Sequence, residues 1–449
     1  MRSGQRLTAL ETSFLALERP GLPMHVAGVV IFDASSHVGM PLTMTDLRHH
    51  VASRLRRLPK YRQLVQVSPL GLNRPEWVRA RNLKLGDHLF HHRLGAPGSR
   101  AQLADLCARI HERLLPRDRP LWEMHLIDGL ADGNQALIVK THHAITDGIA
   151  GIEVAEALFD KGPNVHAEVR PAPRFAEGQR ASMLAPLRAA LGVAFTAAGG
   201  PIASMGPFNG PVGAHRNFGM ATLRMDDIRR IKERLGGSVD DVLLAVVAAG
   251  LSQYLRHQRY PDEPRALRAM LPVSTWPSAA RPSLGNHVTA IFVDLPVQAT
   301  DPAALVRAIA ASKSVLRSAH AAAGMSMLIE AAGLLPHPLH EAVVRFAGGL
   351  MSSNLVLSDV PGPVEPLFLM GRRIVAGYPM IPLPPAVGLS IAAVSIGGVM
   401  SVGVVADPDL LPNPQWLANA FERAVKQFER SCAARRPSRP ARQRTRRAA

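Results

Sequence analysis

The sequence predicts an α/β protein of two domains, and three observations lead to that prediction. The chain has 449 residues, which is long enough for about two or three domains with sizeable cores. Patterns typical of strands and of amphipathic helices alternate through both halves. Between about Lys161 and Pro211 this periodicity is lost and Pro, Gly and Ala dominate. The boundaries we expect are a first domain at 1–165, a linker at 166–215, a second domain at 216–430 and a disordered basic tail at 431–449.

The first half has three Val-, Ile- or Leu-rich stretches and three stretches of helical periodicity. Strands are expected at 24–33, 121–130 and 135–143, and helices at 41–59, 99–115 and 149–159. Thr45 or Asp46 is placed to cap the first helix. The apolar stripe of the second helix is expected to run from Leu103 to Leu114.

Strands and helices also alternate in the second half. The sequence shows no short-period repeat. A strand and a helix are expected within 218–236, and a long buried helix at 238–258 is expected to begin at a cap formed by Ser238 or Asp240. The remaining strands are expected within 287–296, 354–363, 371–379 and 387–407, and the remaining helices at 301–320 and 413–430. Each half is therefore expected to form a mixed sheet flanked by helices.

Composition limits the class of protein and its compartment. Hydrophobic residues make up 47% and charged residues 19% of the chain, which indicates a globular protein. The two cysteines, Cys107 and Cys432, can form no disulfide framework and lack metal-ligand spacing. We see no signal-peptide pattern. The segment Ala189–Gly210 is the nearest approach to a membrane span, but its Gly and Pro favour an interdomain connection. A reducing, cytoplasmic location is expected.

Charge indicates contact with an anionic surface. The net charge is +17, and the tail at 435–449 holds seven arginines and no acid. A segment rich in Pro and Arg is expected to be disordered, and it could attract nucleic acid, anionic lipid or no particular partner. No aromatic residues interleave with the basic ones and no base-reading motif is present, so we expect no specific nucleic-acid partner. Peripheral association with the inner face of a membrane is the favoured expectation.

The stretch "THHAITDG" places two histidines and a carboxylate on one bend. The preceding strand should end near His142 and the following helix should begin near Gly148. Because neighbouring residues on a strand face opposite sides, His142 and His143 should have different roles. The reference pKa of histidine is about 6.5, so one imidazole of the pair suits proton transfer at neutral pH. Asp147 could cap the helix or hold a nearby arginine, and Gly148 lets the backbone turn.

Two other interpretations of the histidine pair compete with catalysis. A metal site needs about three or four ligands, and adjacent histidines on a strand serve that geometry poorly, so no metal is expected. A single histidine is more often structural, but the pattern H-H-x-x-x-D-G between a strand and a helix favours chemistry. The second pair, His91-His92, has no following Asp-Gly and is interpreted as surface.

The stretch "HHAITDG" resembles the HHxxxDG motif of the CoA-dependent acyltransferase superfamily. Further blocks resemble the bacterial wax ester synthase/diacylglycerol acyltransferase family, in order along the chain from Leu7 to about Phe428. They include "LTALETSFLALERPGLPMHVAGVVIFD", the Pro-Leu-Trp element at Pro120 to Trp122, "FNGPVGAHRNF", "LPVSTW", "LGNHVTAIFVDLP" and "NLVLSDVPGPVEPLFLMGRRIVAGYPMIPL". The arginine tail lies outside this resemblance.

The resemblance implies a fold and a reaction. The fold would be two chloramphenicol-acetyltransferase-like domains with the active site in a channel between them. His143 would be the general base that takes a proton from the hydroxyl of diacylglycerol or a long-chain alcohol, whose oxygen then attacks a fatty acyl-CoA. His142 and Asp147 would support the bend, and Gly148 would form its turn. Acyl-CoA would be a substrate, with no cofactor and no metal, and lipid droplets are a further surface at which the protein could act.

Three positions depart from the family pattern. Asp240 stands where the family often has Asn, Asp359 where Asn usually precedes Val-Pro-Gly-Pro, and Trp276 where a basic residue is common. Trp122 is expected in the core, and the "DVPGP" turn is expected to be architectural. Two alternatives stay open: an acyltransferase for another alcohol or amine acceptor, and a lipid-surface binding protein that kept the fold without turnover.

Overall fold

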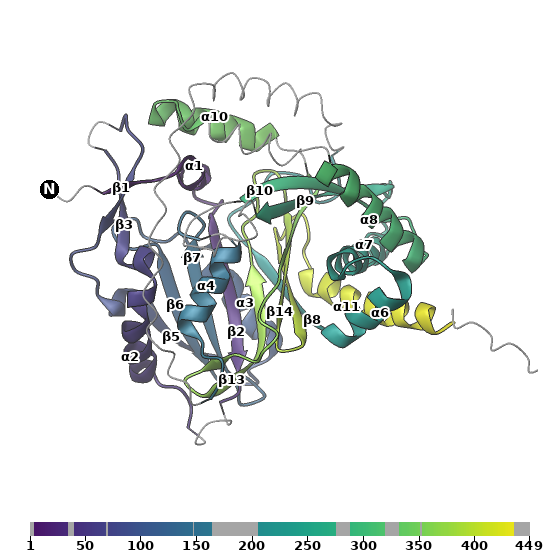
Figure 1. Cartoon of the computed structure of the whole chain (residues 1–449), viewed down its shortest axis with the longest axis horizontal. Helices are drawn as coiled ribbons and strands as arrows, with labels where there is room; N and C mark the ends of the chain where they lie inside the picture. The colour runs from purple at the N-terminus through teal and green to yellow at the C-terminus, as the bar shows by residue number, and fades with distance from the viewer. Residues whose placement is uncertain are drawn as a thin grey trace, which may run out of the picture.

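The computed structural model describes residues 4–34, 40–68, 71–146, 148–163, 205–274, 288–318, 332–350 and 353–434. Within them the chain forms two six-stranded sheets and a small three-stranded sheet. Figure 1 shows the two large sheets side by side, with helices packed against each. This arrangement confirms the α/β class and the mixed sheets flanked by helices.

The first large sheet carries the end of the strand that leads to the histidine bend. Its strand order is β12-β13-β2-β7-β6-β5. The bounds are β2 His25–Phe32, β5 Leu89–Arg93, β6 Trp122–Asp128, β7 Gln135–His142, β12 Phe368–Leu369 and β13 Arg372–Met380. β5 pairs with β6 in parallel, and the other pairs are antiparallel. The centre of this sheet, β2 and β7, lies where the sequence predicted strands.

Two strands of the second half complete this first sheet. β13 pairs with β2 from Ile374↔Phe32 to Met380↔Ala27, and β12 pairs with β13. The sequence pattern assigns both stretches to the domain at 216–430 and does not predict this crossing of the chain back to the first sheet. A strand's partner is set by long-range packing, which local periodicity does not report. The domain boundaries themselves stay a prediction.

The second large sheet is built from the second half alone. Its order is β10-β9-β11-β14-β15-β8, in which β11 lies parallel to both its neighbours. The bounds are β8 Asn217–Arg224, β9 Ala266–Ser274, β10 Val288–Pro296, β11 Leu355–Val360, β14 Leu389–Ile396 and β15 Val399–Ala406. Its core includes apolar side chains of α6 Met225–Leu235, α7 Val239–His257, α8 Pro302–Ser318 and α11 Pro414–Ala434.

Helices cover both faces of the first sheet. On one face, apolar residues of α2 Met44–Arg54 and α4 Gly148–Leu158 share a core with the sheet. On the other face, α3 Arg100–Glu112 packs with residues of both large sheets, including Ile138 and Met220. α3 therefore joins the two sheets through a common apolar core.

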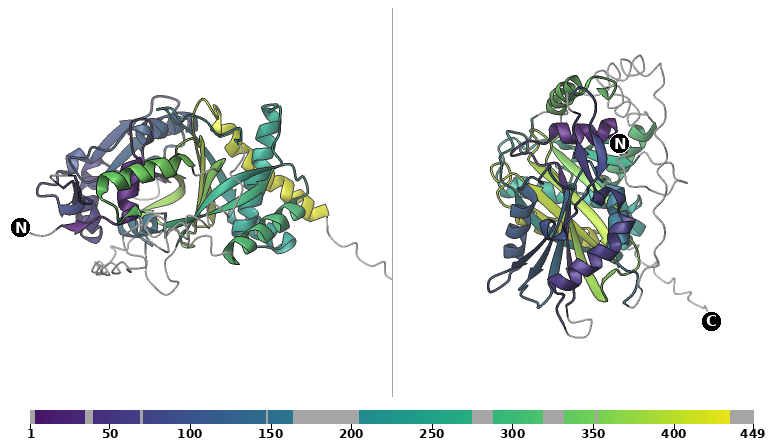
Figure 2. Two further views of the ribbon diagram at one scale, coloured as in Figure 1. Left: turned by 90° about the horizontal axis from the view of Figure 1, so that it is seen from above. Right: turned by 90° about the vertical axis from the view of Figure 1, so that its left-hand side faces the viewer.

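A third layer lies above the end of β7. It consists of α1 Ala9–Leu17, α10 His337–Leu350 and the small sheet β1-β4-β3, whose strands are Gln5–Arg6, Glu76–Arg79 and Gln63–Gln66. α10 packs on α1, as both Figure 1 and the right-hand view of Figure 2 show. Thr8 and Glu11 form a capping box at the start of α1. This helix was not predicted, because its apolar residues do not form a simple stripe.

Some helix ends differ from their predicted positions. α2 begins at the cap Thr43, whose box partner is Asp46, rather than at a cap formed by Thr45 or Asp46. α3 ends at Glu112, so Leu114 is 41% exposed and lies outside the apolar stripe expected for it. The expectations for Asp147, for Trp276, for most of Ala189–Gly210 and for the arginine tail fall outside the described residues.

Among the helices that the structure describes, none taken singly has the length and apolar character needed to cross a bilayer. The pair α6 and α7, bent by 99°, meets that criterion only when its two helices are joined, and by length and composition alone.

Candidate active site

The histidine bend lies between β7 and α4, as the sequence predicts. β7 ends at His142, which pairs with His25 of β2, and α4 begins at Gly148. The backbone N–H of His142 donates to the carbonyl of Leu121 at 3.0 Å, and its carbonyl accepts from Ile145 at 2.9 Å. The second of these bonds closes a tight turn at the end of the strand.

His142 is fully buried and uses both ring nitrogens inside the protein. Nδ1 accepts the N–H of Ala144 at 3.0 Å, so the proton of the neutral ring resides on Nε2. Nε2 lies 3.2 Å from Oε2 of Glu18. Burial lowers the pKa of His142, which keeps the ring neutral near pH 7. This geometry fits the supporting role expected of His142 and leaves it no nitrogen for a substrate.

His143 points elsewhere and is only partly buried. Its backbone N–H donates to the carbonyl of Met24 at 2.8 Å. Its ring stacks on Phe14 of α1, with ring centroids 3.9 Å apart and planes 14° from parallel. The aromatic face therefore sets the plane of the imidazole. The alternation expected for two neighbouring residues holds, since His142 is fully buried against Glu18 and His143 stacks on Phe14 and is only partly buried.

Glu18 follows α1 and was not singled out from the sequence. Its side chain is 3% exposed, and Oε2 lies 3.0 Å from Nε2 of His25 as well as near His142. Oε2 also accepts the N–H of Met24 at 3.2 Å. Burial alone would raise the pKa of Glu18, but the hydrogen bonds from His142 and His25 outweigh it and hold the pKa far below its usual value. Glu18 is therefore an anion beneath the bend.

Arg117 balances the charge of Glu18 from the outer side. Its Nη2 lies 2.5 Å from Oε1 of Glu18, and its side chain is 44% exposed. His25 contributes little charge, because burial lowers its pKa to about 4. Its Nε2 lies near both Glu18, at 3.0 Å, and the N–H of Leu115, at 3.3 Å. One neutral nitrogen cannot serve both, and the shorter contact to a carboxylate is the stronger, so we assign it as a donor to Glu18.

Several residues expected to be structural prove to be so. Trp122 is fully buried and its indole N–H donates to the carbonyl of Tyr61 at 2.8 Å. His91, of the second histidine pair, binds Asp128 at 2.6 Å on the surface. In the "DVPGP" turn, a Cβ added to Gly362 would lie 2.1 Å from the carbonyl oxygen of Ser395, so only glycine fits.

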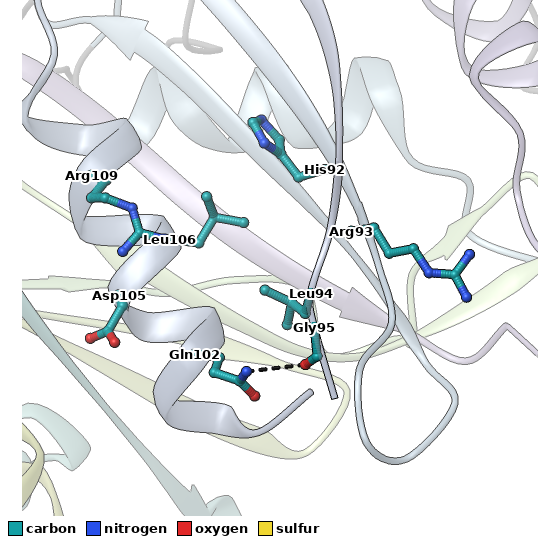
Figure 3. Close-up of a pocket in the computed structure, with 8 residues that line it drawn as sticks. All are labelled: His92, Arg93, Leu94, Gly95, Gln102, Asp105, Leu106 and Arg109. Carbon is teal, nitrogen blue, oxygen red and sulfur yellow. Dashed lines mark hydrogen bonds between the residues drawn. The ribbon is translucent and has the colours of Figure 1, made fainter. Parts of the chain in front are cut away.

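A cavity of about 370 Å³ lies beside β5 and α3, and none of the bend residues lines it. Figure 3 shows Gln102 of α3 bridging to the carbonyl of Gly95 at 3.0 Å, while Arg93 points away on the other side of the strand. This cavity is not the channel expected beside His143, and that channel stays a prediction. Within the described residues no cluster of His, Cys, Asp or Glu could hold a metal ion.

Two of the departures from the family pattern lie together in the second half. Asp240 is not the cap of α7, because Ser238 caps that helix and Asp241 completes the capping box. Asp240 and Asp241 instead both contact Lys313, the latter at 2.7 Å. Burial and the negative charge of Asp240 raise the pKa of Asp359 to about 6, and Lys313 offsets this only in part.

Comparison with known protein families identifies the family of this chain. Its residues 7–195 and 176–243 match the wax ester synthase/diacylglycerol acyltransferase catalytic domain, and 284–429 match the C-terminal domain of the same family. A Mycobacterium tuberculosis protein that carries the name of a diacylglycerol O-acyltransferase, Rv1760, is 33% identical over 94% of this chain and 90% of its own. The chain belongs to this family. It is accordingly an acyl-CoA-dependent O-acyltransferase.

A further relative agrees with this membership, and solved structures share the fold. The tgs2 protein of M. tuberculosis, also named as a diacylglycerol O-acyltransferase, is 28% identical over 94% of this chain and 98% of its own. The wax ester synthase/diacylglycerol acyltransferase of Marinobacter aquaeolei VT8 has the same fold, with a TM-score of 0.72 at 23% identity, covering 96% of this chain and all of that one. The starter condensation domain of rhizomide synthetase, solved with C8-CoA and Leu-SNAC, shares the fold at a TM-score of 0.63 and 13% identity, covering 96% and 94%.

Proposed function

We propose that this family member transfers a fatty acyl group from acyl-CoA to the free hydroxyl of diacylglycerol, and to long-chain alcohols, with His143 as the general base. The observation that carries the proposal is the contrast between the two histidines. Both ring nitrogens of His142 contact groups of the protein, Ala144 and Glu18. His143 is partly exposed, and Phe14 fixes the plane of its ring. The names of the relatives support the choice of acceptor.

The proposed reaction is a direct transfer. His143 takes the proton of the acceptor hydroxyl as its oxygen attacks the thioester carbonyl. The carbon–sulfur bond then breaks, the ester forms, and the proton on His143 passes to the departing CoA thiolate. Holding two substrates in line beside one base accounts for much of the rate enhancement of such a reaction. Because the thioester is already activated, the proposed step needs no metal and no further cofactor.

A panel of acceptors tests the proposal. Purified protein is given labelled fatty acyl-CoA with diacylglycerol, a long-chain alcohol, a short polar alcohol or an amine, and the products are separated. We expect triacylglycerol and wax ester, and far less of either in the same time with His143→Ala. A product formed only with the short alcohol or the amine would reject the proposed acceptor but would still support acyl transfer from acyl-CoA. Binding of lipid vesicles without turnover on any acceptor would reject both.

We further propose peripheral association with an anionic membrane or lipid-droplet surface. The proposal is supported by the apolar acceptor and by the seven arginines at 435–449. The test is sedimentation with vesicles containing anionic lipid, using the full chain and a chain that ends at residue 434. We expect the shorter chain to bind the vesicles less than the full chain does. The difference between the two chains should be largest at low salt, where charges are screened least. Equal binding by both chains would show that the tail does not contribute to membrane association.

A further inference from the structure

Two glutamates lie at opposite ends of α1 and have different surroundings. Glu11, in its first turn, is 3% exposed and binds Lys60 and the indole N–H of Trp77, the latter at 3.1 Å. Glu18, just after the helix, has an equally buried side chain but binds His142, His25 and the backbone of Met24. Glu11 therefore fastens α1 to the small sheet, and only Glu18 reaches the histidine bend.

We propose that Glu18 is a positioning residue for the proton transfer, since its carboxylate fixes both histidines of the bend. The proposal rests on the proposed role of His143 as the base. Glu18 acts on the reaction only through other groups, by two routes that both begin at Oε2. One route runs through the side chain of His142, and the other through the backbone of Met24.

The first route sets the proton position on His142. Nε2 of His142 lies 3.2 Å from Oε2 of Glu18, and this contact with a carboxylate favours the proton on Nε2. The opposite nitrogen, Nδ1, then stays free of a proton and accepts the N–H of Ala144 at 3.0 Å. Ala144 is the residue directly after His143. The ring of His142 thus links the buried carboxylate to the backbone on the far side of the base, and this link requires one tautomer.

The second route holds the backbone on the near side of the base. Oε2 of Glu18 accepts the N–H of Met24 at 3.2 Å, and the carbonyl of Met24 accepts the N–H of His143 at 2.8 Å. The peptide units on both sides of the His143 side chain are therefore tied to a single oxygen atom. A rotation of either peptide would swing the imidazole away from its place against Phe14.

The substitution Glu18→Gln tests this in a defined way, because an amide has only one oxygen. If that oxygen takes the place of Oε2, the amide N–H₂ faces Arg117, which is also a donor. If the amide flips, N–H₂ faces His142, His25 and Met24, which all donate. Either orientation leaves a conflict between donors. In the double variant with Arg117→Gln, the first orientation becomes acceptable, because the new glutamine can offer an oxygen to the amide N–H₂.

We expect Glu18→Gln to lower kcat about 10- to 100-fold, the effect typical of a displaced catalytic group, with KM for acyl-CoA changed less than about two-fold. Arg117→Gln alone should lower kcat less, because the three donors to Oε2 remain. The double variant should recover at least about half of the loss in log kcat. Glu11→Gln is the matched control: it removes an equally buried charge from the same helix and should lower the thermal midpoint while leaving kcat of the folded enzyme unchanged.

A spectroscopic readout keeps the proposal testable if a variant is unstable. Histidine-selective ¹⁵N NMR of the wild-type protein, with the His142 signals assigned by His142→Gln, should show a neutral ring protonated on Nε2 near pH 7 and above. Loss of that tautomer in Glu18→Gln, but not in Glu11→Gln, is the expected result.

Two results would overturn the inference. One is a Glu18→Gln enzyme with the kcat of Glu11→Gln and an unchanged His142 tautomer. The other is a double variant whose loss in log kcat equals the sum of the losses of the two single variants. Failure of the underlying proposal looks different, because His143→Ala would then make ester at the wild-type rate whatever Glu18 does.

Discussion

The two histidines of the bend have different surroundings, and the roles that we propose for them rest on that difference. His142 faces a buried carboxylate, and His143 is partly buried and stacks on Phe14. Their alternation follows from strand geometry and could be predicted from the sequence. Glu18 and Phe14 could not, because they lie more than a hundred residues earlier in the chain and reach the bend only through the packing of α1. The available signal was the block "LTALETSFLALERPGLPMHVAGVVIFD", whose resemblance to the family covers both residues.

Asp359 gives a prediction about pH. Its pKa in the folded protein, about 6, lies above its ordinary value of 3.8, so the folded state holds this proton more tightly than the unfolded chain. The resulting stability is present below about pH 4 and is lost as the pH rises through 6. We expect Asp359→Asn, which restores the residue usual in the family, to raise the free energy of unfolding by about 1–3 kcal/mol at pH 8.

Urea unfolding of wild-type protein and Asp359→Asn between pH 4.5 and pH 8 measures this difference. The gain should shrink toward zero at the acid end of the range. A gain that is the same at every pH would mean that the charge of Asp359 is not its cause.

Helix ends depend on single hydrogen bonds, which makes their exact residues hard to infer from the sequence. The pattern at α7 left both Ser238 and Asp240 as candidates, and at α2 it favoured residues two or three positions after the true cap. In each case the residue three positions after the true cap completes a capping box. The periodicity of the sequence was enough to predict that these helices exist. Their capping residues could be identified only from the local geometry.

Ser238→Ala should therefore destabilise the protein by about 1 kcal/mol, because the N–H of Asp241 loses its acceptor at the start of the buried helix α7. Asp240→Asn keeps the cap, and Lys313 keeps its contact with Asp241, so this change should cost less. Thermal unfolding of both variants compares them. A larger loss in Asp240→Asn than in Ser238→Ala would contradict the assignment of the cap.

The two halves are joined by more than a linker. β13 comes from the second half and lies against β2 of the first sheet, and its Tyr378 hydroxyl binds Thr222 of β8 at 2.7 Å. Arg100 of α3 donates to the same hydroxyl. The alternation of strands and helices could predict two sheets, but the exchange of a strand is a long-range event that no local pattern encodes.

The strand exchange predicts that residues 1–165 do not fold alone. Without β13, the strand β2 would become an edge of the sheet, with a row of unpaired backbone groups and an apolar face exposed. We expect the isolated fragment to be aggregated or unfolded by size-exclusion chromatography and circular dichroism. A monomeric fragment with native strand content would show that β13 is not needed for the first sheet.

The central claim is that His143 removes the proton from the acceptor, and single-turnover acyl transfer tests it most directly. Enzyme is loaded with labelled acyl-CoA, mixed with excess acceptor and quenched over time, for the wild type, His143→Ala and His91→Ala. We predict a fall of about 10²- to 10⁴-fold in the rate of ester formation for His143→Ala alone, with acyl-CoA affinity and thermal midpoint preserved. Ester formation by His143→Ala at the rate of the other two enzymes would contradict the account.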